Sequence, residues 1–173
     1  MPDGGDALTL QAHESIHAIE AADWDACAGA DNPFVSHAFL AALEDSGSVT
    51  AKTGWLPQHL TLTRADGVVV GCAPAYLKSH SYGEYVFDWG WAEAYQRAGG
   101  QYYPKLQVSV PFTPVPGPRL LARPGPAAAE TRRLLLEGLL QMTKLHKASS
   151  LHITFLTEAE WQAARQARPL RRT

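Results

Sequence analysis

The chain has 173 residues, of which 46% are apolar and 18% charged, and its formal net charge at pH 7 is −2. This composition predicts one globular domain with a hydrophobic core, and the charge argues against electrostatic binding to nucleic acid or an anionic membrane. We expect no membrane span and no signal peptide, because the apolar runs are short and the first residues lack a basic region followed by an apolar one. The expected location is therefore the cytoplasm, where Cys27 and Cys72 would be buried free thiols.

The first part of the chain predicts one strand and one clear helix. Apolar alternation at 8–10 and 16–19 predicts a first strand, and a short helical turn follows at 22–30. The clearest helix begins at Asn32 and Pro33, a good cap and a favourable first residue, and ends before a Ser-Gly pair.

The middle of the chain predicts a β-hairpin followed by an aromatic segment. Residues 58–80 contain two apolar runs joined by a turn at 65–67. Pro74 in the return arm predicts an edge strand or a bulge. Residues 81–101 predict a short strand and then a helix that ends at Gly99-Gly100.

The last part of the chain predicts a strand–helix–strand unit. Apolar residues alternate with polar residues or proline over 106–112, which predicts a half-buried strand. A helix at 127–147 and a strand at 151–156 follow, so a right-handed crossover between parallel strands is expected. The resulting fold class is α/β (α+β), a mixed sheet flanked by helices. Pro111 and Pro114 lie where pairing with neighbouring strands should fail.

One motif invites a metal-site interpretation. His13 to His17 reads HESIH and matches H-E-x-x-H, which requires both histidines on one face of a helix. The alternation over 15–19 instead favours a strand, which would separate the two rings, and the extended motif's glycine and third histidine are missing. We therefore expect no metal, with a zinc site as the alternative.

The segment from residue 82 to 103 is rich in aromatic residues. Its aromatic members are Tyr82, Tyr85, Phe87, Trp89, Trp91, Tyr95, Tyr102 and Tyr103, and they are interspersed or followed by Glu84, Asp88, Glu93 and Lys105. Core packing and a ligand-binding groove are both compatible with this mixture. The tail arginines, Arg165, Arg168, Arg171 and Arg172, could contact phosphate, although a solvated end is the simpler interpretation.

Three stretches resemble conserved blocks of the FemAB-like predicted N-acyltransferases, which belong to the GNAT acyltransferase superfamily. They are NPFVSHAFLAALEDSGSV, GEYVFDWGWAEAY and YYPKLQVSVPFTPVPGPRLL. The resemblance spans 15–161, which would leave an N-terminal extension at 1–14 and a basic tail at 162–173. It implies a GNAT-like mixed twisted sheet whose central parallel strands splay to admit an acyl donor. Members typically carry two such halves in tandem, so the resemblance also implies a missing second half or a homodimer.

The same resemblance implies a bacterial acyl- or aminoacyltransferase of peptidoglycan metabolism that acts on an amine. No cofactor is expected to be tightly bound, and the donor would be acyl-CoA or aminoacyl-tRNA, the latter being the sole reason to expect a nucleic-acid partner. The residues after Arg119 and Arg123 do not fit the Q/R-x-x-G-x-G/A loop of ordinary GNAT enzymes. The alternative is a non-catalytic module that binds a partner, a cell-wall precursor or a second copy of itself.

The candidate site residues follow from the resemblance and from residue type. Asp88 and Glu93 are possible proton acceptors by residue type alone, and Tyr103 completes the catalytic set. The candidates for donor binding are Pro111, Phe112, Thr113, Gly117 and Arg119. The candidates for substrate binding are Trp89, Trp91, Tyr102 and Lys105, and no residue is assigned to a metal.

Overall fold

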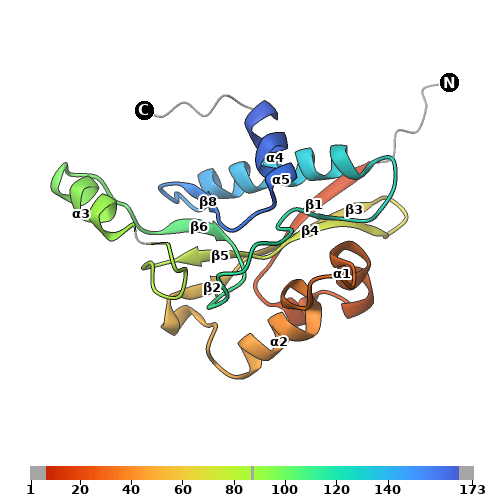
Figure 1. Ribbon diagram of the computed structural model, residues 1–173, viewed down its shortest axis with the longest axis horizontal. Helices are drawn as coiled ribbons and strands as arrows, with labels where there is room; N and C mark the ends of the chain where they lie inside the picture. The colour runs from red at the N-terminus through yellow and green to blue at the C-terminus, as the bar shows by residue number, and fades with distance from the viewer. Residues whose placement is uncertain (1–6, 87, 168–173) are drawn as a thin grey trace.

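The computed structural model describes residues 7–86 and 88–167. Phe87 and the tail arginines Arg168, Arg171 and Arg172 lie outside the described residues. Within the described part, the chain forms two four-stranded sheets and five α-helices, which confirms the predicted α+β class. Figure 1 shows helices on both faces of the sheets.

The two sheets differ in strand direction. The first has the order β1-β3-β4-β7, is antiparallel throughout, and consists of Leu8–His13, His59–Arg64, Val69–Ala73 and Leu121–Ala122 in that order. The second has the order β2-β5-β6-β8 and consists of Trp55–Pro57, Ala75–Lys78, Lys105–Val108 and Leu151–Ile153. In this sheet β6 and β8 are parallel, so the predicted parallel crossover is confirmed.

The predicted hairpin connects the two sheets. Its arms, β3 and β4, pair antiparallel on either side of the predicted turn. Gln58 separates β2 from β3, and Pro74 separates β4 from β5, so both arms pass from one sheet to the other. Pro74 is therefore a junction between strands, and its carbonyl accepts a hydrogen bond from the Ser109 amide at 3.3 Å. The register irregularity of this hairpin lies at Leu62/Thr63 instead.

Each face of the sheets has its own helices and its own apolar core. α4 (Ala128–Leu145) covers one face, with α5 (Glu158–Ala167) beside it, and α1 (Ala21–Ala28) and α2 (His37–Asp45) lie on the other face (Figure 1). The core under α4 includes Leu60, Leu62, Leu106, Val108, Leu135, Leu139 and Met142. The core under α1 and α2 includes Ile16, Trp24, Cys27, Leu40 and Cys72, and both thiols are free and buried as predicted. The remaining helix, α3 (Trp89–Arg97), lies apart at one end of the molecule.

Three short 3₁₀ turns, Ile16–Ala18, Pro33–Val35 and Ala51–Thr53, connect these elements. The first replaces the strand predicted at 16–19, because the Ser15 side chain accepts from the His17 amide and caps the turn. The second is capped by Asn32, as predicted, but Ser36 is extended and starts α2 as a separate helix.

The strand β6 is shorter and more buried than predicted. It ends at Val108, and the Phe112 amide donates to the Gly83 carbonyl at 3.0 Å instead of joining a neighbouring strand. Pairing therefore fails around the prolines, as predicted. The prediction of half-burial is wrong, because Gln107 and Ser109 on the polar face are as buried as Leu106 on the apolar face.

The ends of the predicted domain also differ from the structure. The predicted N-terminal extension contains β1, and the predicted basic tail begins inside α5. The signal for α5 is a capping box, in which Thr157 and Glu160 exchange hydrogen bonds between side chain and backbone. None of the described helices is long and apolar enough to span a bilayer.

Candidate active site

Two buried lysines face each other across the second sheet. The antiparallel register of β5 and β6 places Lys78 opposite Lys105, and both residues are 0% exposed. Side chains alternate along a strand, so the lysines lie on one face while Leu77 and Leu106 pack under α4 on the other. Like charges directly opposite each other destabilise a sheet unless other groups neutralise them.

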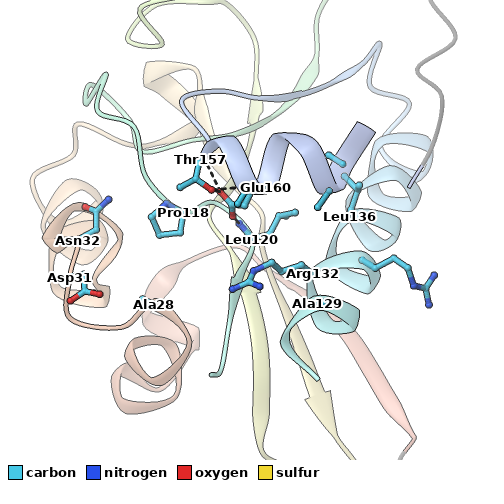
Figure 2. Close-up of a pocket in the computed structure, with 14 residues that line it drawn as sticks. Ala28, Asp31, Asn32, Pro118, Leu120, Ala129, Arg132, Leu136, Thr157 and Glu160 are labelled. Carbon is cyan, nitrogen blue, oxygen red and sulfur yellow. Dashed lines mark hydrogen bonds between the residues drawn. The ribbon is translucent and has the colours of Figure 1, made fainter. Parts of the chain in front are cut away.

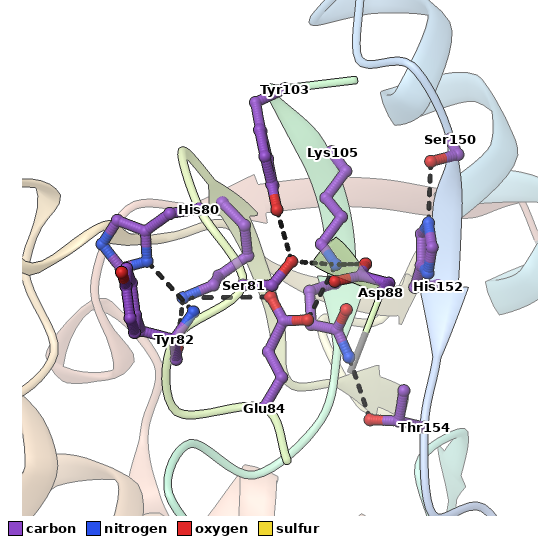
Figure 3. A network of polar contacts seen from close by, with 12 residues as sticks. His80, Ser81, Tyr82, Glu84, Asp88, Tyr103, Lys105, Ser150, His152 and Thr154 are labelled. Atoms are coloured by element: carbon purple, nitrogen blue, oxygen red, sulfur yellow. Dashed lines mark hydrogen bonds and ion pairs between the residues drawn. The ribbon is translucent and has the colours of Figure 1, made fainter. Parts of the chain in front are cut away.

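The loop between β5 and α3 provides the neutralising groups. The Lys105 Nζ donates to Glu84 Oε2 at 2.7 Å, to Asp88 Oδ2 at 2.6 Å and to the Ser81 hydroxyl at 3.0 Å. Figure 3 shows these three side chains around the end of Lys105. An ammonium has three donors, so Lys105 is fully hydrogen-bonded.

Lys78 is held more loosely. Its Nζ donates to the Tyr82 carbonyl at 3.1 Å, lies 3.4 Å from the centroid of the Trp55 ring, and is 4.0 Å from Glu84 Oε1. Burial, together with the charge of Lys105, lowers the pKa of Lys78 to about 7. The charge of the cluster therefore changes near neutral pH.

The pKa values of the two carboxyl groups, Glu84 and Asp88, are shifted in opposite directions. Burial raises the pKa of Glu84 above its ordinary value despite the contact with Lys105. Burial acts in the same sense on Asp88, but hydrogen bonds, led by that of Lys105, hold its pKa below the ordinary value. Asp88 is thus the firmly ionised carboxylate of the pair.

Two tyrosines complete this cluster. The Tyr102 hydroxyl donates to Asp88 Oδ2 at 2.6 Å, and the Tyr103 hydroxyl lies 2.6 Å from Ser81 Oγ. Burial raises the pKa of both tyrosines, and the hydrogen bond to Asp88 raises that of Tyr102 further. Both phenols are therefore neutral hydrogen-bonding groups at physiological pH.

Several polar atoms on this face have no hydrogen-bond partner among the described residues. They are Glu84 Oε1, Asp88 Oδ1, Gln107 Oε1 and Ser109 Oγ. Buried polar atoms in native proteins are nearly always paired, so a group of unpaired ones calls for an explanation. All four atoms are inaccessible to solvent, so a ligand could bond to them only after a movement of the loop that covers them.

The parallel strand β8 adds a neutral histidine beside the cluster. Burial, with the nearby charge of Lys105, lowers the pKa of His152 to about 4, so its imidazole is neutral at pH 7. The Nε2 of His152 lies 2.8 Å from the Ser150 hydroxyl, and its ring is 6.1 Å from that of Tyr102. His152 therefore extends the polar face to β8.

An aromatic pocket lies on the outer side of the same loop. Its volume is about 270 Å³, and its lining residues are Ser81, Tyr82, Gly83, Tyr85, Val86, Trp89 and Phe112. Tyr82 and Trp89 remain 62% and 52% exposed, with their rings 5.3 Å apart. The loop therefore directs polar side chains inward to the lysines and aromatic side chains outward, which favours the binding groove over pure core packing.

The floor of the aromatic pocket is closely packed against the cluster. A Cβ on Gly83 would lie 2.6 Å from the Phe112 ring, so glycine is required there. The Phe112 ring is 5.7 Å from that of Trp55, and the Trp55 ring in turn contacts the Lys78 ammonium. Tyr85 and Phe112 both have positive φ, at 57° and 59°, a backbone conformation that concentrates at functional sites.

The structure brings together about half of the predicted site residues. Asp88, Tyr102, Tyr103 and Lys105 belong to the polar cluster, and Trp89 and Phe112 line the aromatic pocket. Glu93 lies outside, because it is exposed on α3 and pairs with Arg97 at 2.6 Å. Trp91 is 77% exposed on the same helix and does not line the pocket.

The predicted donor-binding residues beyond Phe112 lie elsewhere. The buried Arg119 guanidinium donates to the backbone carbonyls of Val115, Pro118 and Thr154. Gly117 lies against Asn32, which a Cβ would meet at 2.1 Å, and Thr113 donates its hydroxyl to the Pro111 carbonyl at 3.0 Å.

Other members of the cluster were not predicted as site residues. They are Lys78, Ser81, Glu84, Gln107, Ser109 and His152. For Lys78 the sequence contains one indication of burial. Lys78 follows the buried Tyr76 by two residues, so both side chains lie on the same face of the strand. The partners of Lys105 come from a loop without periodicity, and no sequence rule places them.

The HESIH histidines have separate partners. His13 Nε2 lies 2.9 Å from the Thr61 hydroxyl, and His17 Nε2 lies 2.8 Å from Asp45 Oδ1. No group of three or more His, Cys, Asp or Glu side chains is placed to hold a metal ion in the part of the chain that the structure describes.

One comparison with known proteins gives a match. The model of the FemAB-like family, described as peptidoglycan biosynthesis/recognition, matches residues 15–173. No curated protein and no solved structure is significantly similar to the chain.

Proposed function

Because the chain belongs to the FemAB-like family of peptidoglycan biosynthesis and recognition, we propose that it transfers an acyl or aminoacyl group to an amine of a peptidoglycan precursor. The donor would be an aminoacyl-tRNA or an acyl-CoA, which would confine the reaction to the cytoplasm. The observation that carries the proposal is the buried polar cluster, where two opposed lysines, two carboxyl groups and two tyrosines lie beside an aromatic pocket.

The chemistry needs a neutral amine at the acyl carbon, so the protein must orient the amine and accept its proton. Asp88 is the candidate contact, since its lowered pKa keeps it ionised and its side chain is 9% exposed. A low pKa makes Asp88 a good acceptor of hydrogen bonds from the amine. Glu84, with its raised pKa, is the better final acceptor of the proton.

We assign the aromatic pocket to the acceptor. The exposed faces of Tyr82 and Trp89 offer apolar contact, while Ser81 connects the pocket to the polar cluster through its contacts with Lys105 and Tyr103. An acceptor held on these rings would present its amine toward Asp88. Such a pocket would increase the rate of transfer mainly because it positions the acceptor amine, and less because it increases the affinity for the acceptor.

For the donor we retain the segment from Pro111 to Thr113, directly after β6 has left the sheet. Phe112 lines the aromatic pocket, and the Thr113 hydroxyl donates to the Pro111 carbonyl two residues earlier. Arg119 would act indirectly, because its guanidinium fixes the carbonyls of Val115, Pro118 and Thr154 and so shapes the chain that follows this segment.

The test is a transfer assay with mass-spectrometric detection. The protein is incubated with aminoacyl-tRNA or acyl-CoA and a peptidoglycan peptide that has a free side-chain amine, and the same peptide with an acetylated amine is the control. We expect a mass increase of one acyl or aminoacyl group on the free amine alone. Absence of any product across both donor classes would refute the transferase.

A second candidate is a non-catalytic binding module, which the exposed aromatic residues of α3 favour. Trp91 and Tyr95 are 77% and 51% exposed, and α3 lies apart from the sheets (Figure 1). The occupant would be a second copy of the chain or a second GNAT-like half. Light scattering separates the two functions, since a Trp91→Ala variant would dissociate a dimer formed through α3 and leave transfer by a monomer unchanged.

A further inference from the structure

A second and larger pocket lies away from the lysine cluster, between α4 and α5. Its volume is about 680 Å³, which is within the range of pockets that hold small ligands. Figure 2 shows α4 and α5 on one side and the segment after α1 on the other. Its lining residues are Ala28, Asp31, Asn32, Pro118, Leu120, Ala129, Arg132, Arg133, Leu136, Thr157, Ala159, Glu160, Ala163 and Ala164. We call it the interhelical pocket.

The walls of the interhelical pocket are mostly apolar. Its apolar lining consists of alanines from α1, α4 and α5 together with Leu120, Leu136 and Pro118. Small side chains at the facing positions of two helices leave space between them. Such walls suit a chain of methylene groups, whose burial is favourable in proportion to the apolar area removed from water.

The acidic group at one end of the pocket is already satisfied. Glu160 Oε1 accepts from the amides of Arg119 and Leu120 at 2.9 and 2.7 Å, and its Oε2 accepts from the amide of Thr157 at 3.1 Å. These bonds join the start of α5 to the segment after β6. Glu160 therefore builds the wall and is not available to a ligand.

Two adjacent arginines of α4 differ in their partners. Arg133 is held by Glu130 and Glu137 on the exposed side of the helix. Arg132 is half-buried and has no hydrogen bond or ion pair with any of the described residues. Figure 2 shows its guanidinium reaching across the pocket from α4, while Asp31 lies on the opposite rim.

From these features we propose that the interhelical pocket binds a free amphiphilic anion, a molecule with an apolar chain and one carboxylate or phosphate group. The apolar chain lies along the alanine walls, and the anionic group bonds to the Arg132 guanidinium, whose planar fork matches both oxyanions. The chain's net charge of −2 does not attract anions in general, so the selectivity rests on Arg132.

This binding is independent of the transfer reaction. Apart from Thr157 and its neighbours in α5, the pocket is built from α1, α4 and the segment after β6, and it shares no lining residue with the aromatic pocket. A failed transfer assay would therefore not count against anion binding by the interhelical pocket. A failed binding assay would likewise not count against the transferase function.

The test is a calorimetric titration of the whole chain with decanoate, decyl phosphate, decanol and decylamine, which share one chain length. We expect decanoate and decyl phosphate to bind below their micelle concentrations, and the alcohol and amine to bind about tenfold or more weakly. Arg132→Gln is expected to remove this preference. Lys144→Gln is the matched control and should bind as the wild type does, because Lys144 is exposed on α4 and does not line the pocket.

A pocket-filling variant and a vesicle assay complete the design. Ala164→Phe, which places a ring in the pocket from α5, should abolish decanoate binding without lowering the unfolding midpoint. Equal affinity for the amine and the carboxylate, or unchanged binding by Arg132→Gln or Ala164→Phe, would overturn the proposal. So would binding to phosphatidylglycerol vesicles without binding to free decanoate, or a dimer that covers the pocket.

Discussion

At the scale of single residues, the pair Lys78 and Lys105 is the least expected feature of the molecule. Opposed lysines with no solvent exposure oppose folding, because both desolvation and mutual repulsion disfavour them. Glu84 and Asp88 reduce this cost, although apolar residues in the same places would stabilise the sheet more simply. A costly arrangement beside a pocket indicates a site whose residues serve chemistry.

Removing Lys105 should destabilise the protein strongly. Lys105→Met leaves Glu84 and Asp88 buried without their main cation, and breaking such a buried pair costs about 3–5 kcal/mol. Urea denaturation measures the change. The control is Lys144→Met on the exposed side of α4, which should change the free energy of unfolding by less than about 0.5 kcal/mol. Similar values for the two variants would refute the coupling of Lys105 to the carboxyl groups.

Lys78 should make stability depend on pH in a defined window. Its pKa is about 7 in the folded protein, whereas the ordinary pKa of a lysine is 10.5. Between these values the unfolded chain binds more protons, so stability rises with pH. The wild type should therefore gain stability relative to Lys78→Met from about pH 7 to 10. Urea titrations of both proteins across this range measure the difference. A difference that is constant with pH would contradict the lowered pKa.

At the scale of elements, the residues of β6 predict the strand and its parallel neighbour correctly, but they do not predict the burial of its polar face. The alternation that begins at Leu106 identified the strand, and the following helix and strand correctly indicated a parallel neighbour. The same alternation predicted a solvent-facing polar side, whereas Gln107 and Ser109 are buried. A polar residue on a strand indicates that its surroundings are polar. Whether these surroundings are water or protein depends on the loop that folds over the strand.

A close contact between β4 and α4 predicts the effect of one added methyl group. A Cβ on Gly71 would lie 2.5 Å from Thr131 Cγ2 and 3.1 Å from Leu135 Cδ1, so Gly71→Ala should cost about 1–3 kcal/mol. Gly90→Ala in α3 is the control, because no atom lies within 4 Å of its added Cβ, and it should not destabilise. Thermal unfolding followed by circular dichroism compares the two, and equal midpoints would contradict the packing.

The start of α5 predicts a second effect at this scale. Glu160→Ala removes the acceptor for the amides of Thr157, Arg119 and Leu120, so buried donors lose their partners at about 1–3 kcal/mol each. Glu158→Ala, two residues earlier and exposed, should have a small effect. Amide hydrogen exchange at Arg119 and Leu120 should accelerate in Glu160→Ala alone. Unchanged exchange there would show that α5 does not anchor this segment.

At the scale of the whole molecule, the order of the helices and strands can be predicted from the sequence. The distribution of the strands between two sheets cannot. Local periodicity and turn residues predict the hairpin, α4 and the parallel crossover. The separation into two sheets depends on where both hairpin arms break, at Gln58 and Pro74, and this is a long-range property. The helix α5 was mistaken for a tail because its basic residues outweighed its capping box.

The candidate site was predictable in part for the same reason. Asp88, Tyr102 and Lys105 were selected by residue type and by the family resemblance, without knowledge of their contacts. Lys78 was missed because a lysine at the end of a hairpin arm is usually solvated. What makes it part of the site is its register with Lys105, which only the paired strands reveal.

The rate of acyl transfer by wild type and Asp88→Asn, measured side by side with the peptidoglycan peptide acceptor, tests the central claim most directly. Asn keeps the shape of Asp88 but cannot accept a proton or carry the charge that holds the amine. We predict transfer by the wild type and a loss of about 100-fold or more in the variant, measured well below its unfolding midpoint, which should fall because Lys105 loses one of its two carboxylates. Equal rates for the two proteins, or no transfer by the wild type, would contradict the assignment of this cluster as the active site.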